Sequence, residues 1–362
     1  MSSPLRLRGP ADLVAVLPYQ LGYHPSSSLV LVAFHDTRMG LVQRLDLPGE
    51  DDVGVAAEAL LGPLVAEQPD SVLLFGYEER EGASIPMLDA TASACASAGI
   101  RVQDRIVVRA GRWFSPDCGP PCCPMAGTPL PEPGDLPVVA EFVGREIAPL
   151  RDRAALVDSL RPRDLARGRR IARLARTMSR ARERAAAPGG VPGHFWEQDL
   201  RAWGLLLRFD DDATAVEQLE DALCAALAVS LGDLGLRDAV VSWLCPGSMP
   251  AELVEPELRQ QVERALPERA WGGKGPLGGE ALSSAVAMQR VERRLVTLCG
   301  CLDDQWAVAP LTVLGAFAWW RGDGALSRVA LDRALQAAPD YRLALLLEQM
   351  VDLAIRPDRR SA

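Results

Sequence analysis

Hydrophobic and polar positions follow two different periods along this chain, and the change falls near residue 137. Before it, runs rich in Val, Leu and Phe are typical of strands; they lie at 28–34, 39–47, 71–77, 100–109 and 111–114. Segments with helical spacing separate these runs, at 11–21, 53–67 and 85–98. This order predicts an α+β or α/β domain, residues 1–137, in which helices cover a mixed β-sheet.

From residue 138 to 362 only helical spacing is present. Breaks rich in proline and glycine divide this part into about seven helices; they lie at 187–193, 245–250 and 271–279. We therefore expect an all-α helical domain after the mixed-sheet domain.

The last two helices resemble a tetratricopeptide-like helical hairpin. The small, bulky and terminating residues of that repeat fall at Gly315, Ala318, Gly322, Ser327, Leu331, Ala334 and Pro339. Ser327 replaces the usual alanine, and no second copy is found, whereas a solenoid needs several. An ordinary closing hairpin is therefore the favoured interpretation.

No segment has the roughly 20 uninterrupted apolar residues of a membrane span. The first residues also lack the apolar run and cleavage site of a signal peptide. We therefore expect a cytoplasmic protein with no membrane partner, whose eight cysteines are mostly reduced thiols.

Three of these cysteines, Cys118, Cys122 and Cys123, fall within six residues of the irregular, proline- and glycine-rich loop 115–137. Long ordered loops often carry function. Thiolates bind soft metals and exchange disulfides, so the cluster is a candidate zinc site or a candidate redox site. The third interpretation is that these small side chains only pack the loop onto the sheet.

The cluster cannot complete a structural zinc site by itself, because such a site needs four ligands. A fourth ligand would have to come from another part of the chain. The candidates are His24, His35 and the pair Cys299 and Cys301.

The turn after the first predicted helix is a second candidate binding site. If the two following strands pair, they bring polar residues to one end of the sheet: Gly22, His24, Ser26, Ser28, Arg44 and Asp46. A Ser/His/Asp hydrolase would need a serine on a sharp elbow, and the G-x-S-x-G motif is absent. Turn chemistry, with Arg44 paired to an acid, is the favoured interpretation.

The charge of the chain is uneven. Residues 151–184 carry twelve arginines and four acids, a net of +8 in a chain of net −9, so the remainder carries −17. Within 161–184, helical spacing predicts an apolar stripe of Ile171, Leu174, Met178 and Ala181. A different side of this predicted helix carries Arg173, Arg176 and Arg180.

This arginine face could bind an acidic protein or the phosphates of nucleic acid. The favoured interpretation is a solvated face paired with the chain's own acids, because aromatic residues for base stacking are absent. The glycines around Lys274, the only lysine, do not form a phosphate-binding loop, since glycine follows the lysine and no strand precedes the segment.

Several motifs together resemble the actinobacterial domain-of-unknown-function 4192 family. They lie at 12–14 (DLV), 21–25 (LGYHP), 28–32 (SLVLV), 44–48 (RLDLP), 113 (W), 122–124 (CCP), 127–129 (GTP), 319 (W), 322–324 (GDG), 333–335 (RAL) and 339–341 (PDY). The resemblance spans nearly the whole chain. It implies a cytoplasmic protein with no established activity, and it brings no catalytic residues.

No recognisable catalytic constellation is present in the sequence. The favoured function is a non-catalytic interaction or regulatory protein whose partner is another protein. The alternatives are an enzyme or metal/redox protein that uses the loop cysteines and the His24 turn, and nucleic-acid binding through residues 161–184.

Overall fold

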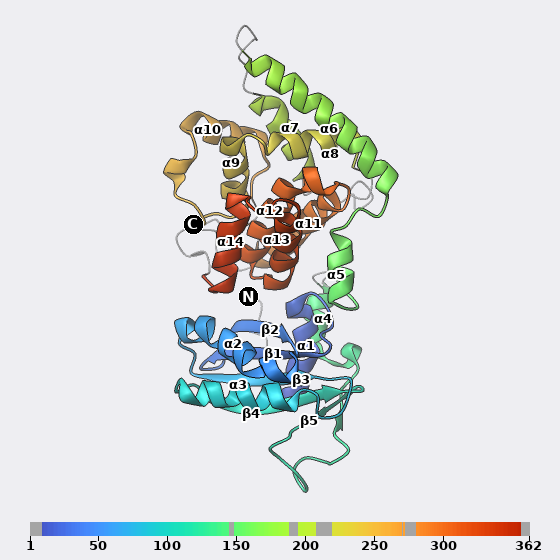
Figure 1. Cartoon of the computed structure of the whole chain (residues 1–362), viewed down its shortest axis with the longest axis vertical. Coiled ribbons are helices and arrows are strands. Elements are labelled where there is room, and N and C mark those ends of the chain that lie inside the picture. The colour runs from blue at the N-terminus through green and yellow to red at the C-terminus, as the bar shows by residue number, and fades with distance from the viewer. Residues whose placement is uncertain are drawn as a thin grey trace. The chain divides into compact units, whose positions relative to one another are not determined.

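The computed structural model describes residues 9–144, 148–187, 195–207, 219–269, 271 and 280–355 (Figure 1). They form two compact units. The first runs to Arg153 and also contains Asp352–Ala354, and the second begins at Ala154. The first unit thus extends past residue 137, where the sequence analysis places the boundary. The reason is that α4 (Pro137–Gly144) packs on the first helix, α1 (Pro10–Leu21).

Six strands of the first unit form one mixed sheet, in the order β2-β1-β3-β4-β5-β6. The strands are β1 (Ser28–His35), β2 (Arg38–Asp46), β3 (Ser71–Tyr77), β4 (Arg101–Arg109), β5 (Arg112–Phe114) and β6 (Thr128–Pro129). β3 and β4 are parallel, and the other neighbouring pairs are antiparallel. The predicted mixed sheet is confirmed. β6 was missed, because two residues are too short to show a period.

Helices and the central strands share one apolar core. Leu29 and Leu31 of β1 pack with Leu64 of α2 (Val53–Glu67) and Leu88 of α3 (Ile85–Ser97), and all four are fully buried. A short 3-10 helix, η1 (Glu50–Asp52), leads into α2, and another, η2 (Pro133–Asp135), precedes α4. Side chains alternate along a strand, so the neighbours of Leu29 and Leu31 point to the opposite face of the sheet.

The described part of the second unit contains helices and no strand, as predicted. The helices are α5 (Arg153–Ser159), α6 (Leu165–Ala186), α7 (Trp196–Leu206), α8 (Asp221–Ser230), α9 (Leu234–Leu244), η4 (Ala251–Leu253), α10 (Pro256–Ala265), α11 (Glu280–Cys299), α12 (Asp304–Arg321), α13 (Gly324–Ala337) and α14 (Arg342–Asp352). They outnumber the expected helices, because turns as short as 231–233 interrupt the chain without proline. None of the described helices is both long and apolar enough to cross a bilayer.

α12 and α13 form the predicted closing hairpin. Gly322 ends α12 in the left-handed conformation (φ 95°), and Asp323 caps α13 by accepting a hydrogen bond from the Leu326 amide at 2.8 Å. The Ser327 hydroxyl donates to the Gly315 carbonyl at 2.9 Å. This bond links the two helices.

A buried guanidinium joins this hairpin to the helices around it. Arg333 of α13 donates to the carbonyls of Leu160, Cys299 (3.0 Å) and Leu302 (2.9 Å) and to the Asp304 carboxylate (2.9 Å). Only 9% of Arg333 is exposed. One side chain thus donates to carbonyls that follow α5, end α11 and lie in the turn after it.

We predict that Arg333→Met destabilises the second unit by about 3 kcal/mol, because it removes the donors of several buried carbonyls. A loss of that size corresponds to a fall of roughly 6–12 °C in the midpoint of thermal unfolding. Circular dichroism at 222 nm measures this midpoint. Arg328→Met on the same helix is the control, because Arg328 makes a half-exposed ion pair with Glu348 at 3.7 Å. Equal midpoints for the two variants would contradict the role given to Arg333.

Candidate metal centre

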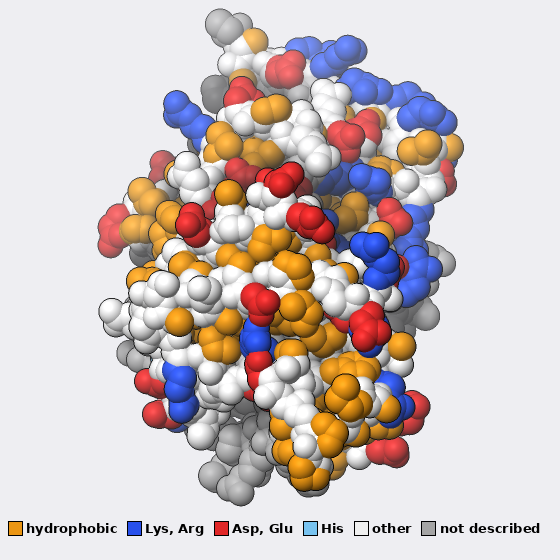
Figure 2. Space-filling view, turned by 60° about the horizontal axis from the view of Figure 1, so that its bottom comes forward, with side chains coloured by type: hydrophobic (Ala, Val, Ile, Leu, Met, Phe, Trp, Pro, Cys, Tyr) orange, Lys and Arg blue, Asp and Glu red, His pale blue; other side chains and the backbone are white. Residues whose placement is uncertain are grey.

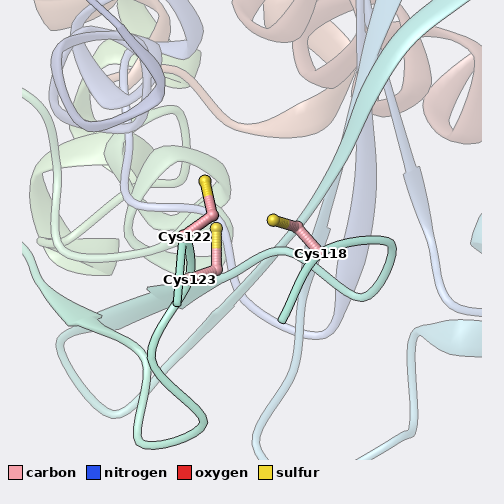
Figure 3. A group of neighbouring side chains, drawn as sticks. All are labelled: Cys118, Cys122 and Cys123. Carbon is pink, nitrogen blue, oxygen red and sulfur yellow. The ribbon is translucent and has the colours of Figure 1, made fainter. Parts of the chain in front are cut away.

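The loop between β5 and β6 brings three thiols together (Figure 3). The Sγ atoms of Cys118, Cys122 and Cys123 all lie within 4.8 Å of one another. Figure 3 shows Cys122 and Cys123 side by side, with Cys118 pointing toward them across the loop. Cys118 and Cys122 are exposed and Cys123 is half-buried, so these side chains contribute little to packing on the sheet.

Ion pairs and backbone bonds hold both ends of this loop. Arg105 of β4 donates from Nε to the Asp117 carboxylate at 2.7 Å and also pairs with Asp89 of α3. At the other end, Arg112 of β5 donates to the Ala126 carbonyl at 2.7 Å. The loop is therefore fixed to the sheet immediately before the first cysteine and after the last.

Turns inside the loop orient the thiols. The amides of Cys122 and Cys123 both donate to the Gly119 carbonyl, at 3.1 and 3.0 Å, which places the two side chains next to each other. Gly127, with φ 70°, follows against the ring of Phe114, and a Cβ atom there would lie 2.5 Å from that ring. Any larger residue at 127 would displace the end of the loop.

The neighbouring thiols restrain the ionisation of Cys123. Hydrogen bonding to Cys118, desolvation and hydrogen bonding to Cys122 raise the pKa of the Cys123 thiol to about 12. A hydrogen bond from Arg105 lowers the pKa of Asp117. This carboxylate therefore stays ionised and remains bound to Arg105. Without a bound cation, the cluster therefore does not carry three thiolates at neutral pH.

None of the predicted fourth ligands belongs to this cluster. Among the described residues, the group of possible metal ligands consists of the three cysteines alone. His35 Nε2 lies 3.3 Å from the Glu67 carboxylate, and the side chain of His24 is exposed. Cys299 is fully buried, and Cys301 accepts a hydrogen bond from Arg167. The fourth position is thus left open by the described chain.

The strand register brings most of the His24 turn together. Ser28 pairs with Asp46 across β1 and β2. Arg44 forms an ion pair with Asp46 and donates to the Ser26 carbonyl at 3.4 Å. The turn itself begins at Gly22, which is left-handed with φ 75°.

The same turn lacks the contacts of a catalytic triad. Ser28 is fully buried, and its hydroxyl has no hydrogen-bond partner among the described residues. The His24 amide donates to the Leu150 carbonyl at 3.0 Å, but its exposed ring makes no described bond to Ser28. A nucleophile–base pair requires such a bond.

Helix α6 exposes its arginines, but its buried face differs from the predicted stripe. Leu174 is 38% exposed, and the buried residues are Gly168, Ile171, Ala172 and Ala175. Ile171 of the predicted stripe is buried, but Leu174 and Ala181 are exposed and Met178 is half-buried; α8 packs on this helix, and small residues make up the rest of the buried face. Figure 2 shows blue side chains along the upper right margin, on the side where Figure 1 draws α6.

The arginines of α6 fall into two groups. Arg167 and Arg170 pair with Asp221, and Arg182 pairs with Asp199. A second group is exposed and makes no ion pair within the described part of the chain; it consists of Arg169, Arg173, Arg176, Arg180 and Arg184. The Lys274 loop lies outside the described residues.

Sequence reasoning missed the anchors of the cysteine loop. Arg105 and Asp117 are twelve positions apart, and only the pairing of β4 with β5 brings them together. The one local signal was the acid immediately before Cys118.

Comparison with known proteins gives one result. The model of the family described as "Domain of unknown function (DUF4192)" matches residues 10–270 and 274–358. No curated protein and no solved structure matches the chain. The match covers both units, with the β5–β6 loop and the closing hairpin, and the chain therefore belongs to the DUF4192 family.

Proposed function

We propose that the β5–β6 loop binds a thiophilic metal ion, with Zn²⁺ the first candidate, and that the protein is a non-catalytic binding or regulatory protein. The observation that carries the proposal is the convergence of three sulfur atoms within 4.8 Å on an anchored loop. Soft thiolate ligands favour Zn²⁺ and Cu⁺ over the hard cations Mg²⁺ and Ca²⁺.

The spacing of the sulfurs is close to that of a zinc site. Two sulfurs on a tetrahedral ion with Zn–S bonds of about 2.3 Å lie about 3.8 Å apart. The sulfurs of the loop therefore need to move together by no more than about 1 Å, a small adjustment for the exposed thiols of Cys118 and Cys122.

The open fourth position would allow a partner protein to bind the metal ion directly. A structural zinc ion is closed by four protein ligands, whereas three ligands leave a position for water or an outside donor. Because the site is exposed, a side chain of a partner protein can supply that donor. Metal binding would then regulate partner binding in the reducing cytoplasm, where the thiols stay free.

A second candidate function is the binding of an acidic partner protein by α6. Its support is the exposed row Arg173, Arg176 and Arg180, which makes no described ion pair. Nucleic acid is the less favoured partner, because the remainder of the chain carries a large negative charge and repels phosphate.

We predict that reduced, chelator-treated protein takes up one Zn²⁺ per chain. Cys122→Ser should weaken this binding by at least about tenfold, because the hydroxyl is a poor soft-metal ligand. Competition with a zinc indicator dye measures the affinity, and elemental analysis gives the stoichiometry. Cys301→Ser is the control, since that cysteine lies outside the cluster. Uptake that is unchanged in Cys122→Ser would exclude this site.

Zinc binding should release protons. The pKa of the Cys123 thiol is raised to about 12, so this thiol is protonated at neutral pH and must ionise to bind the ion. The affinity for Zn²⁺ should therefore increase between pH 6 and pH 8. If binding releases one proton, the affinity rises roughly tenfold for each pH unit, and further protons make the rise steeper. Calorimetry in buffers of different ionisation enthalpy counts the protons, and a count of zero would contradict ligation by thiolates.

For α6 we predict that Arg173→Gln, Arg176→Gln and Arg180→Gln together abolish salt-sensitive binding to a polyglutamate probe. The matched control is Arg182→Gln on the same helix, because Arg182 is already bound to Asp199. Fluorescence anisotropy at two salt concentrations is the measurement. Duplex DNA is a parallel probe, and stronger binding to DNA than to polyglutamate would reverse the preferred partner.

A further inference from the structure

We propose that Cys301 and Cys224 form a second thiol site, in the helical unit, in which small hydroperoxides oxidise Cys301 and Cys224 resolves the product to a disulfide. The site is independent of the loop cysteines. It consists of three elements that are distant in sequence: α6, α8 and the turn between α11 and α12.

A guanidinium and a thiol both face Cys301. Arg167 of α6 donates from Nη1 to the Cys301 sulfur at 3.3 Å, and the Cys224 thiol of α8 lies close enough to the same sulfur to change its pKa. Arg167 also donates from Nε to Asp221 at 2.8 Å, which fixes the plane of the guanidinium. Two neighbouring cysteine sulfurs form a disulfide when they approach to about 2.05 Å.

These neighbours favour the thiolate of Cys301. The hydrogen bond from Cys224, with the charge of Arg167, outweighs burial and the opposing charge of Asp221 and lowers the Cys301 pKa to about 7. The same hydrogen bond and burial raise the pKa of Cys224, so the proton stays on Cys224. The charged groups that face the pair are Arg167 and Asp221, and Arg170 reaches it only through Asp221.

The other cysteines of the helical unit show the contrast. Burial raises the pKa of Cys245, and burial raises the pKa of Cys299 to about 12. Both are fully enclosed, whereas Cys301 is half-buried and can meet a small reagent. A partly exposed thiolate beside a cation is the environment of a reactive cysteine.

The reaction balances without a cofactor. The Cys301 thiolate attacks one oxygen of hydrogen peroxide, the O–O bond breaks, and the products are Cys301 sulfenic acid and hydroxide, which takes a proton to become water. The Cys224 sulfur then attacks the Cys301 sulfur, and the displaced hydroxyl leaves as water with the Cys224 proton. Two thiols lose two electrons to the peroxide, and an external dithiol restores them by exchange.

The test uses full-length protein in which the loop cysteines are replaced (Cys118→Ser, Cys122→Ser, Cys123→Ser), so that failure of the proposed metal site has no effect on it. In this protein Cys301 is the one remaining cysteine that is not buried. Treatment with a small excess of hydrogen peroxide at pH 7 should remove two thiols per chain. Mass spectrometry of non-reduced peptides should identify a Cys224–Cys301 disulfide, which dithiothreitol reverses.

Matched variants test the role of the arginine. Arg167→Gln should slow formation of the disulfide at pH 7 by about tenfold and move the midpoint of Cys301 alkylation to higher pH, because the cation is lost. Arg170→Gln is the control, since Arg170 contacts Asp221 but not Cys301. With Cys224→Ser, peroxide should leave a sulfenic acid on Cys301 that a dimedone probe captures. If no disulfide forms in the parent protein, or if Cys301 alkylates with a midpoint near 8.5, that of an unperturbed thiol, the proposal is wrong.

Discussion

The helical unit depends on a buried cation, Arg333. Arg333 gathers the carbonyls of Leu160, Cys299 and Leu302 around one guanidinium, so that the ends of separate helices meet at α13. Burial of a charge is expensive unless it is paired and hydrogen-bonded, and here Asp304 and the carbonyls supply both conditions. The turn that carries Cys301 is therefore held on both sides of the cysteine, at Cys299 and Leu302. This explains how a half-exposed thiol keeps a fixed position beside Arg167.

The two thiol sites differ in the cation that is available to them. At Cys301 a guanidinium lies 3.3 Å from the sulfur and the pKa of the thiol falls. In the β5–β6 loop the anchoring guanidinium of Arg105 is already bound by Asp117 and Asp89, and the neighbouring thiols raise the pKa of Cys123. The first site is thus suited to nucleophilic chemistry by itself, whereas the second requires an external cation to stabilise its thiolates.

The sequence predicted what depends on local period and composition. The strands at 28–34 and 71–77, the covering helices and the closing hairpin follow from apolar spacing, and the family follows from motifs spread over both units. The stripe on α6 held at Ile171 but not at Leu174, because period alone does not distinguish a large apolar residue from a small one, and the buried face uses Gly168, Ala172 and Ala175. The contact between Cys224 and Cys301 could not be predicted, because nothing local links positions so far apart.

The sites described above depend on arginine. The chain has a single lysine, so arginine supplies nearly all of its basic side chains. Arg333 reaches several carbonyls and a carboxylate at once, Arg105 joins two carboxylates, and Arg167 divides its donors between Asp221 and a sulfur. Each task needs several donors in a fixed plane, which a guanidinium provides and a single ammonium group does not. Lysine at any of the three positions would keep the positive charge but lose the planar set of N–H donors. Charge alone therefore does not account for the way this protein positions its thiols.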